Sequence, residues 1–387
     1  MKKIAKILIA IIVMSLLLTG CGGNASKTVK IAYIGPITGP NAAIGIGMKN
    51  SAQLAIDQAN KSGKLPYKLE LVVLDDVSDP AQAVNAVNKA ASDPDIVAAV
   101  AHFNSGCALA TVHTFNKYQL PAVIIGAIHD QITENGYPEI TRVISAASIQ
   151  NKVAGDVAVK EFGVKRISVI HDQTDYGKTN ADQFIAQAKA NGAEILSYDG
   201  ISVGQQDFSA VLTAIKSKNP EMVFFGGLAT EAALIKRQMK ELNINALFMS
   251  DSGILSTTFN EIAADAAEGA IAHGIGKPIE DLPGGQAYIE AYKNAGFKEP
   301  YEAYGPFAYD ATNIVIDALS RVEKPDRASL TKAIRETKNF PGILGETSFD
   351  EKGQTTLDLI TTYISENGEW VPYYKSKIKV VDKQIKK

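Results

Sequence analysis

Cysteine is scarce in this sequence, and so are long basic runs. Two cysteines among 387 residues cannot build a disulfide scaffold. Lysine plus arginine number 39 against 42 acidic residues, and no long basic run precedes the C-terminal tail, so the charge pattern of a nucleic-acid-binding protein is missing. The composition, 46% hydrophobic and 21% charged, excludes a disordered chain, and the length favours two domains.

The N-terminus carries the pattern of an export signal. Three lysines precede an apolar stretch over residues 7–18, which is too short for a membrane-spanning helix and is typical of a signal peptide. The following Leu-Thr-Gly-Cys resembles the lipobox of bacterial lipoproteins, which is cleaved before its cysteine. We therefore expect a signal peptide over residues 1–20, lipidation of Cys21, and a flexible tether over residues 21–27.

Apolar runs and helical spacings alternate along the rest of the chain. We expect strands over residues 29–34, 69–74, 96–101 and 121–126, with helices at 48–59, from Pro80, and at 105–118. A second set follows, with strands at 166–170, 194–198, 222–225 and 246–249 and helices at 149–162, 177–191, 208–218 and 230–242. Alternation of this kind builds parallel sheets covered by helices on both faces.

The last third of the chain departs from the alternation. We expect helices over residues 286–295, 308–321 and 328–337, strands over 347–349, 357–364 and 370–374, and a lysine-rich solvated tail. The sequence thus predicts an α/β protein with two similar sets of elements in tandem. Such domains bind small ligands at the carboxyl ends of their parallel strands.

The sequence lacks a complete form of the common catalytic and cofactor-binding motifs. Lys178-Thr179 follows a glycine as in a phosphate-binding loop, but Asp172 occupies the position of its first glycine. The dinucleotide fingerprint fails because Asn50 replaces its third glycine. The nucleophile elbow and the zinc-protease motif are absent, and the five histidines lack metal-ligand spacing. We therefore expect neither enzyme activity nor a cofactor or metal, and we expect Cys107 to be a packed small hydrophobic residue.

Several short motifs, in order along residues 28 to about 375, carry a resemblance. They are Ile34-Gly35-Pro36-Ile37-Thr38-Gly39-Pro40 with Gly45, Leu74-Asp75-Asp76-Val77-Ser78-Asp79-Pro80-Ala81-Gln82-Ala83, His171-Asp172-x-x-x-Tyr176-Gly177, Asp207-Phe208-Ser209, Gly226-Gly227 with Glu231, and Phe349-Asp350-x-x-Gly353. Together they resemble the leucine/isoleucine/valine-type periplasmic binding proteins of ABC transporters, fold type I.

This resemblance implies two doubly wound parallel-sheet lobes joined by a three-strand hinge. Lobe 1 would comprise residues 28–146 plus 276–352, and lobe 2 residues 147–275 plus 353–387. The lobes would close around a ligand held in the cleft between them.

The resemblance also implies a site for the two charges of a free amino acid. Ser105 can cap the helix after the third strand, so that its hydroxyl and the helix N-terminus suit a carboxylate. Ile128 stands where family members often have a hydroxyl residue, so here its backbone N–H would serve, and Gly126 would offer its carbonyl to the ammonium. Glu231 matches the family carboxylate that pairs with the ammonium.

Two further residues would assist Glu231, and four would hold the ligand's side chain. Tyr176 could stack on the ammonium or donate to the ligand, and Asp251 is a reserve acid. The side-chain pocket would be formed by Ile44, Phe103, Asn104 and Tyr304. Two of its members favour a branched-chain or aromatic side chain, while Asn104 and Tyr304, with His129 nearby, also leave room for a more polar ligand. Core packing is the alternative role for these residues.

The resulting interpretation is a monomeric solute-binding lipoprotein, extracytoplasmic and lipid-anchored to the bacterial cell membrane. It would deliver a small amino acid, with the branched-chain type as the leading candidate, to an ABC permease and its ATPase. One alternative is a sensory or regulatory ligand-binding module of the same fold. Another is a binding protein for a different small amide or an aromatic acid. An enzyme would instead require a nucleophile–base pair in the cleft.

Overall fold

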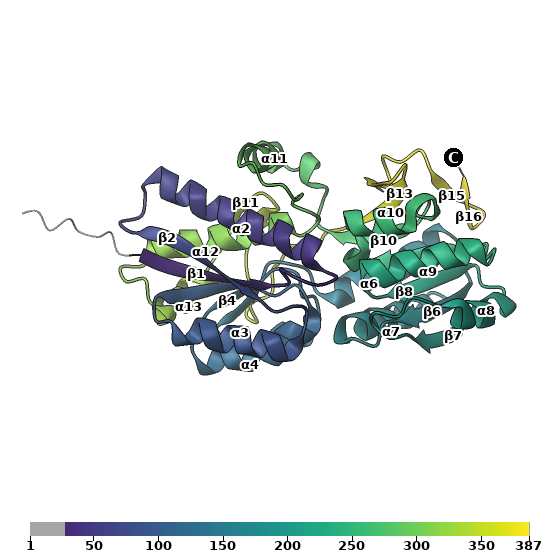
Figure 1. Ribbon diagram of the computed structural model, residues 1–387, viewed down its shortest axis with the longest axis horizontal. Helices are drawn as coiled ribbons and strands as arrows, with labels where there is room; N and C mark the ends of the chain where they lie inside the picture. Colours follow the sequence, from purple (N-terminus) through teal and green to yellow (C-terminus); the bar gives the residue numbers. More distant parts are fainter. Residues whose placement is uncertain (1–27, 387) are drawn as a thin grey trace, which may run out of the picture.

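The computed structural model describes residues 28–386, so the predicted signal peptide, Cys21 and the tether lie outside the described residues. Two α/β lobes lie side by side, each built on its own sheet (Figure 1). The first sheet has the order β2-β1-β3-β4-β5, and every pairing in it is parallel. The second has the order β14-β13-β10-β9-β8-β6-β7, in which only the pairings of β13 are antiparallel. The doubly wound architecture expected from the sequence is confirmed.

Lobe 1 here means the first sheet and the helices on its two faces. Its strands are β1 (Thr28–Gly35), β2 (Lys68–Asp75), β3 (Ile96–Ala101), β4 (Ala122–Ile124) and β5 (Ile140–Arg142). Its helices are α2 (Ala42–Ser62), α3 (Pro80–Ser92), α4 (Ser105–Lys117), α5 (Gln131–Glu134), α11 (Gly285–Asn294), α12 (Gly305–Arg321) and α13 (Arg327–Arg335), with the short hairpin β11 (Phe340–Gly342) and β12 (Gly345–Thr347).

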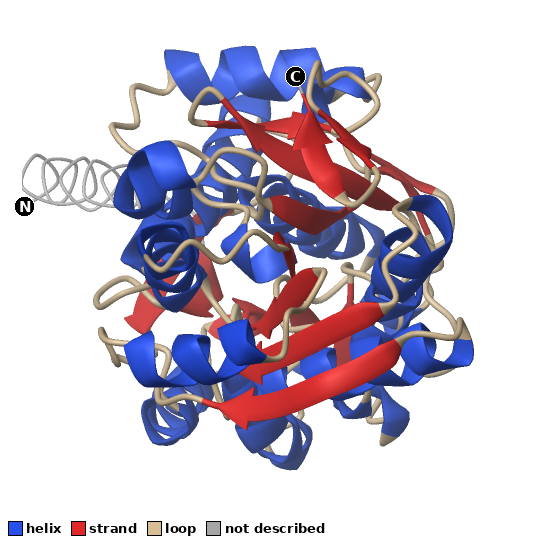
Figure 2. Cartoon of the chain, turned by 90° about the vertical axis from the view of Figure 1, so that its right-hand side faces the viewer, coloured by secondary structure: helices blue, strands red, loops and turns tan. Residues whose placement is uncertain are grey.

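Lobe 2 means the second sheet with its helices, and Figure 2 turns it toward the viewer. Its strands are β6 (Arg166–His171), β7 (Glu194–Gly200), β8 (Met222–Gly226), β9 (Leu247–Asp251), β10 (Ile271–Ile275), β13 (Ile360–Glu366) and β14 (Glu369–Pro372). Its helices are α6 (Ala147–Asp156), continued by a π-helical turn at Val157–Glu161, and α7 (Asp175–Ala190), α8 (Ser209–Ser217), α9 (Ala229–Glu241) and α10 (Thr257–Ala263). Short 3-10 turns lie at Ser252–Ile254, Ala264–Ala266 and Ile279–Asp281.

Local sequence explains the strands and helix starts that the prediction located. Every residue of β3 is buried, as expected where helices cover both faces of a parallel sheet. Helix α3 begins at Pro80 after Asp79, whose side chain accepts a hydrogen bond from the Gln82 backbone N–H at 2.8 Å. The first face of the lobe 1 sheet packs against α2 and α12, and the second against α3 and α4.

The chain passes between the two sheets three times, after β5, after β10 and before β13. The first and third passages are tied together at Arg142, which is almost fully buried. Its Nε donates to Gln354 Oε1 at 2.6 Å, and Gln354 Nε2 donates to the Ile144 carbonyl at 2.9 Å. The Gly276 N–H of the second passage donates to the Leu359 carbonyl of the third at 2.6 Å, so the hinge region is a hydrogen-bonded unit rather than three separate linkers.

The prediction of a solvated C-terminal tail is wrong. Residues Lys379–Val381 and Gln384–Lys386 form the hairpin β15–β16, which packs on lobe 2. Ile378 is buried just before it, and Lys383 forms an ion pair with Glu221 at 2.6 Å. Lysine side chains can cover apolar surface while their charged ends stay in water. The lysine-rich composition of this segment therefore did not reveal that it packs on lobe 2. Within residues 28–386, the helices are all too short or too polar to cross a membrane.

Candidate functional site

A cavity of about 470 Å³ lies between the lobes at the carboxyl ends of their strands. Lobe 1 lines it with the loops after β1, β2 and β3, and lobe 2 lines it with the loops after β6, β7 and β8. This is the location expected for a ligand in parallel α/β sheets, and the volume lies in the ordinary range of small-molecule sites.

Helix α4 provides the lobe 1 wall, with residues 104–107 facing the cavity. The structure corrects the expected capping role of Ser105, because Asn104 occupies the N-cap and Ser105 is the first helical residue. The Ser105 Oγ instead accepts hydrogen bonds from the backbone N–H groups of Ile128 and His129 at 3.3 and 3.4 Å. Its hydroxyl hydrogen remains able to donate, beside the N–H groups of the first helical turn.

The loop after β4 supports Ser105 from behind. The N–H of Ile128, expected to serve the ligand, is directed to Ser105, and the Ile128 side chain is buried in the lobe 1 core. Gly126 donates its N–H to the His102 carbonyl at 3.1 Å. A Cβ atom at Gly126 would lie 2.9 Å from the Cα of Phe103, so the close approach of the two loops requires glycine there.

The lobe 2 wall contains two buried carboxylates, Asp172 and Glu231. Asp172 accepts hydrogen bonds from the backbone N–H and the hydroxyl of Thr174 at 3.0 and 2.6 Å. Burial, with a contribution from the nearby Glu231, raises the pKa of Asp172 to about 6. Glu231 Oε1 accepts the N–H of Gly204 at 2.8 Å, and the residue is 5% exposed.

Two glycines allow two segments of the lobe 2 wall to pack closely against each other. A Cβ atom on Gly177 would lie 2.1 Å from Asp172 Oδ1 and 2.4 Å from the Gly226 carbonyl oxygen, and one on Gly226 would lie 2.2 Å from the Gly177 carbonyl oxygen. The N-terminal turn of α7 therefore packs backbone to backbone against the end of β8. This contact gives a structural role to Gly177 and Gly226, which both belong to the motifs that carried the resemblance.

The charges on the cavity wall are of one sign. Asp79, Asp172, Asp175 and Glu231 line it, and the lining residues among the described part of the chain include no lysine, arginine or histidine. Asp172 was not predicted as a site residue, although its position directly after a buried strand could have indicated one. The wall favours a positively charged ligand group.

Tyr176 lies in the first turn of α7 and Asp251 at the end of β9, and Asp251 is not among the residues that line the cavity. Tyr176 lines the cavity, and its hydroxyl accepts the N–H of Gly253 at 2.9 Å. Asp251 is 1% exposed, and neither of its carboxylate oxygens has a hydrogen-bond partner among residues 28–386. Burial raises the pKa of Asp251 to about 8.

Only some of the residues predicted to form the side-chain pocket line the cavity. Asn104 lines it, and its Oδ1 is buried without a partner in the described chain. Ile44 and Phe103 lie in the lobe 1 core and are not among the lining residues. Tyr304 meets Phe103 edge to face, with ring centroids 5.0 Å apart, and lines a second inter-lobe cavity of about 450 Å³ near the hinge. The apolar lining residues that the prediction missed include Val77, Val203 and Leu228.

Two lobes around a cleft with separated polar walls define the class of a two-lobed solute-binding protein. A family model described as periplasmic binding protein matches residues 28–369, and the chain belongs to this family. Within residues 28–386, side chains nowhere gather into a group of three that could hold a metal ion.

Relatives with similar sequences cover most of the chain. It is 33% identical over 348 residues to Leu/Ile/Val-binding protein homolog 1 of Brucella suis, an alignment that covers 90% of this chain and 93% of that protein. It is 32% identical over 343 residues to the leucine-, isoleucine-, valine-, threonine- and alanine-binding protein of Pseudomonas aeruginosa, which covers 88% and 90% of the two chains. These relatives carry the names of binding proteins rather than of enzymes.

The solved structure of a leucine-binding protein, LivK of Thermotoga maritima, has the same fold. It superposes with a TM-score of 0.83 at 28% identity, covering 89% of this chain and 97% of that one. The type I periplasmic binding protein fold expected from the sequence is thereby confirmed.

Proposed function

We propose that this protein binds a small amino acid between its lobes and delivers it to an ABC importer. The single observation that carries the proposal is the separation of polar groups in the cavity, with a helix N-terminus and Ser105 on one wall and the carboxylates of Asp172 and Glu231 on the other. A zwitterion fits such a site because its carboxylate and ammonium face opposite partners. The names of the relatives point to the branched-chain class.

Asp172, Glu231 and Asp251 are the candidates for direct contact with the ammonium. Glu231 already accepts a backbone hydrogen bond, whereas the buried carboxyl of Asp251 has both oxygens without a partner in the described chain. A ligand that bridges the lobes would stabilise their closed arrangement by its differential affinity for it. Closure would occur about the three passages between the lobes, near residues 146, 276 and 353.

Calorimetric titration of ligand-stripped protein with leucine tests this proposal. Leucinamide and isocaproate, which lack the carboxylate and the ammonium respectively, serve as ligand controls. We expect micromolar or tighter leucine binding that both controls lose. Glu231→Gln and Asp251→Asn identify the ammonium partner, with Asp265→Asn, whose side chain is 85% exposed, as the matched control. The absence of binding to any amino acid would refute the proposal.

We also propose that Cys21 carries the lipid that anchors the protein outside the cytoplasm, and that the protein is a monomer. The support is the sequence pattern of residues 1–21 and the need for the cleft to open freely. Membrane fractionation of the wild type and of Cys21→Ser tests the anchor, because the variant should leave the membrane fraction. Light scattering on the released protein tests the monomer.

A further inference from the structure

The loop after β2 holds two residues in the left-handed backbone region. Val77 has φ of 45° and Ser78 has φ of 60°. A β-branched residue rarely adopts this conformation, because its Cβ substituents crowd the backbone. Glycine or asparagine would occupy the same position with less strain. A use of its side chain would account for the presence of valine at this position.

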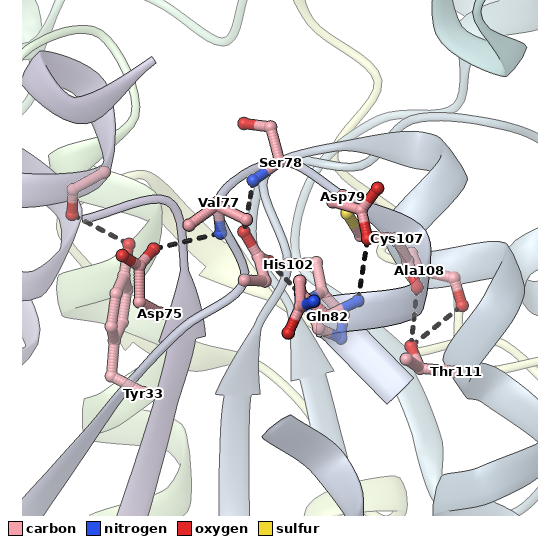
Figure 3. Close-up of polar contacts among 12 residues, drawn as sticks. Tyr33, Asp75, Val77, Ser78, Asp79, Gln82, His102, Cys107, Ala108 and Thr111 are labelled. Carbon is pink, nitrogen blue, oxygen red and sulfur yellow. Dashed lines mark hydrogen bonds and ion pairs between the residues drawn. The ribbon is translucent and has the colours of Figure 1, made fainter. Parts of the chain in front are cut away.

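Hydrogen bonds fix this loop in place (Figure 3). Asp75 Oδ1 accepts the N–H of Val77 at 3.0 Å, and Asp76 Oδ1 accepts the N–H of Ser78 at 3.0 Å. Asp75 also accepts the N–H of Ile37 at 2.8 Å from the neighbouring loop. The surrounding structure thus over-determines the strained conformation and presents the Val77 side chain in a defined position.

Val77 is also exposed, and an apolar residue of the other lobe lines the same cavity. Val77 is 40% exposed and Val203, in the loop after β7, is 57% exposed. Leu228, which is half-buried, adds apolar surface to the lobe 2 side. These side chains contribute apolar surface to a cavity whose charged groups are all acidic. The apolar portion of a bound ligand would bury this surface.

We propose that Val77 and Val203 contact the ligand's side chain from opposite lobes and select amino acids with large apolar side chains over alanine and glycine. This inference rests on the proposed amino-acid binding and specifies the class of ligand side chain. The ligand's charged groups would face α4 and the lobe 2 carboxylates, while its side chain would extend toward the valine pair. Strain at Val77 is then retained because the contact discriminates among ligands.

Val77→Asn and Val203→Asn test this inference by titration with leucine, phenylalanine and alanine. Asparagine accepts the left-handed backbone of Val77, so Val77→Asn should unfold at the same temperature as the wild type or higher. Each variant should weaken leucine and phenylalanine binding roughly three- to tenfold, because apolar burial is lost, and alanine binding less than about twofold. Val381→Asn, at a 42% exposed valine of the C-terminal hairpin, is the control and should leave the affinity for all three ligands unchanged.

The outcomes separate this inference from the proposed function. If the wild type binds leucine and Val77→Asn and Val203→Asn bind it equally well, the inference is wrong and the proposed function stands. An equal loss of affinity for leucine and for alanine, in a variant with wild-type stability, also overturns the inference, since that pattern means general damage to the site. If the wild type binds no amino acid, both proposals fall together.

Discussion

Asp76 and His102 meet at 2.9 Å between Oδ2 and Nδ1, and both side chains are fully buried. The contact joins the loop after β2 to the loop after β3. Asp76 Oδ1 meanwhile accepts the N–H of Ser78, and three residues beyond His102 the chain enters α4 at Ser105. One carboxylate thus positions both the strained Val77–Ser78 turn and the helix start that forms the lobe 1 wall of the site.

Removing this carboxylate should destabilise the protein. We expect Asp76→Ala to lower the free energy of unfolding by about 2–3 kcal/mol, because the His102 imidazole and the Ser78 N–H both lose their partner. Urea denaturation measures the change. Asp265→Ala, which removes an exposed ion pair with Lys240 at 2.7 Å, should cost about 0.5 kcal/mol or less. Equal losses in the two variants would contradict the assigned role.

The sequence located most of the elements because burial on both faces leaves a continuous apolar run. β3 at Ile96–Ala101 coincides with its predicted range, and α4 differs by one residue. β10, an interior strand of the lobe 2 sheet, was missed because His273 and Gly274 interrupt its short apolar run. Its burial comes from strands on both sides, one of them β13, nearly a hundred residues away in the sequence, and local patterns carry no such information.

The site was predictable only where a residue's role follows from its place on an element. Ser105, Tyr176 and Glu231 lie in the first turn of the helix that follows a strand, and all three line the cavity. Ile44 and Phe103 were assigned by position along the chain, but the direction of a side chain depends on packing that the sequence does not encode locally. The left-handed conformation of Val77 is likewise set by contacts of Asp75 and Asp76, not by the preference of valine.

The backbone contact between Gly177 and Gly226 should tolerate no side chain. We expect Gly177→Ala to destabilise the protein by about 1–3 kcal/mol and to weaken ligand binding, because the added methyl group would displace Asp172 from the cavity wall. Thermal denaturation and titration measure the two effects. Gly200→Ala is the control, since its added methyl group would meet only the Gln173 side chain, at 3.0 Å. A fully stable Gly177→Ala would show that the two segments can separate without cost.

Glu302 and Thr257 join the two lobes near the hinge. The Glu302 carboxylate accepts the backbone N–H of Thr257 at 3.2 Å and its hydroxyl at 2.7 Å. Because the contact bridges the lobes, its loss should lower the fraction of closed protein and raise the ligand Kd. We expect about a threefold rise for Glu302→Gln and for Thr257→Val, measured by titration. The Kd of the double variant should be no higher than that of the single variant with the higher Kd. A Kd that rises by the product of the two single effects would contradict the coupling.

Asp172 should make ligand binding depend on pH. Its folded-state pKa of about 6 lies above the ordinary value of 3.8, so the group binds more protons in the folded than in the unfolded chain between these values. Its contribution to the stability of the ligand-free protein is therefore lost as pH rises through 6. Ligand affinity should follow the opposite course, because an ammonium facing this wall favours the ionised carboxyl.

A ligand that lowers the pKa of Asp172 by one unit would bind about fivefold more weakly at pH 5 than at pH 7.5. Calorimetry at pH 6 in buffers of different ionisation enthalpy should detect proton release on binding. Asp172→Asn should abolish that release, whereas Asp265→Asn should retain it, because the exposed Asp265 lies outside the cavity. Affinity that stays constant from pH 7.5 to 5 would mean that the ammonium lies away from Asp172, which leaves Glu231 or Asp251 as its partner.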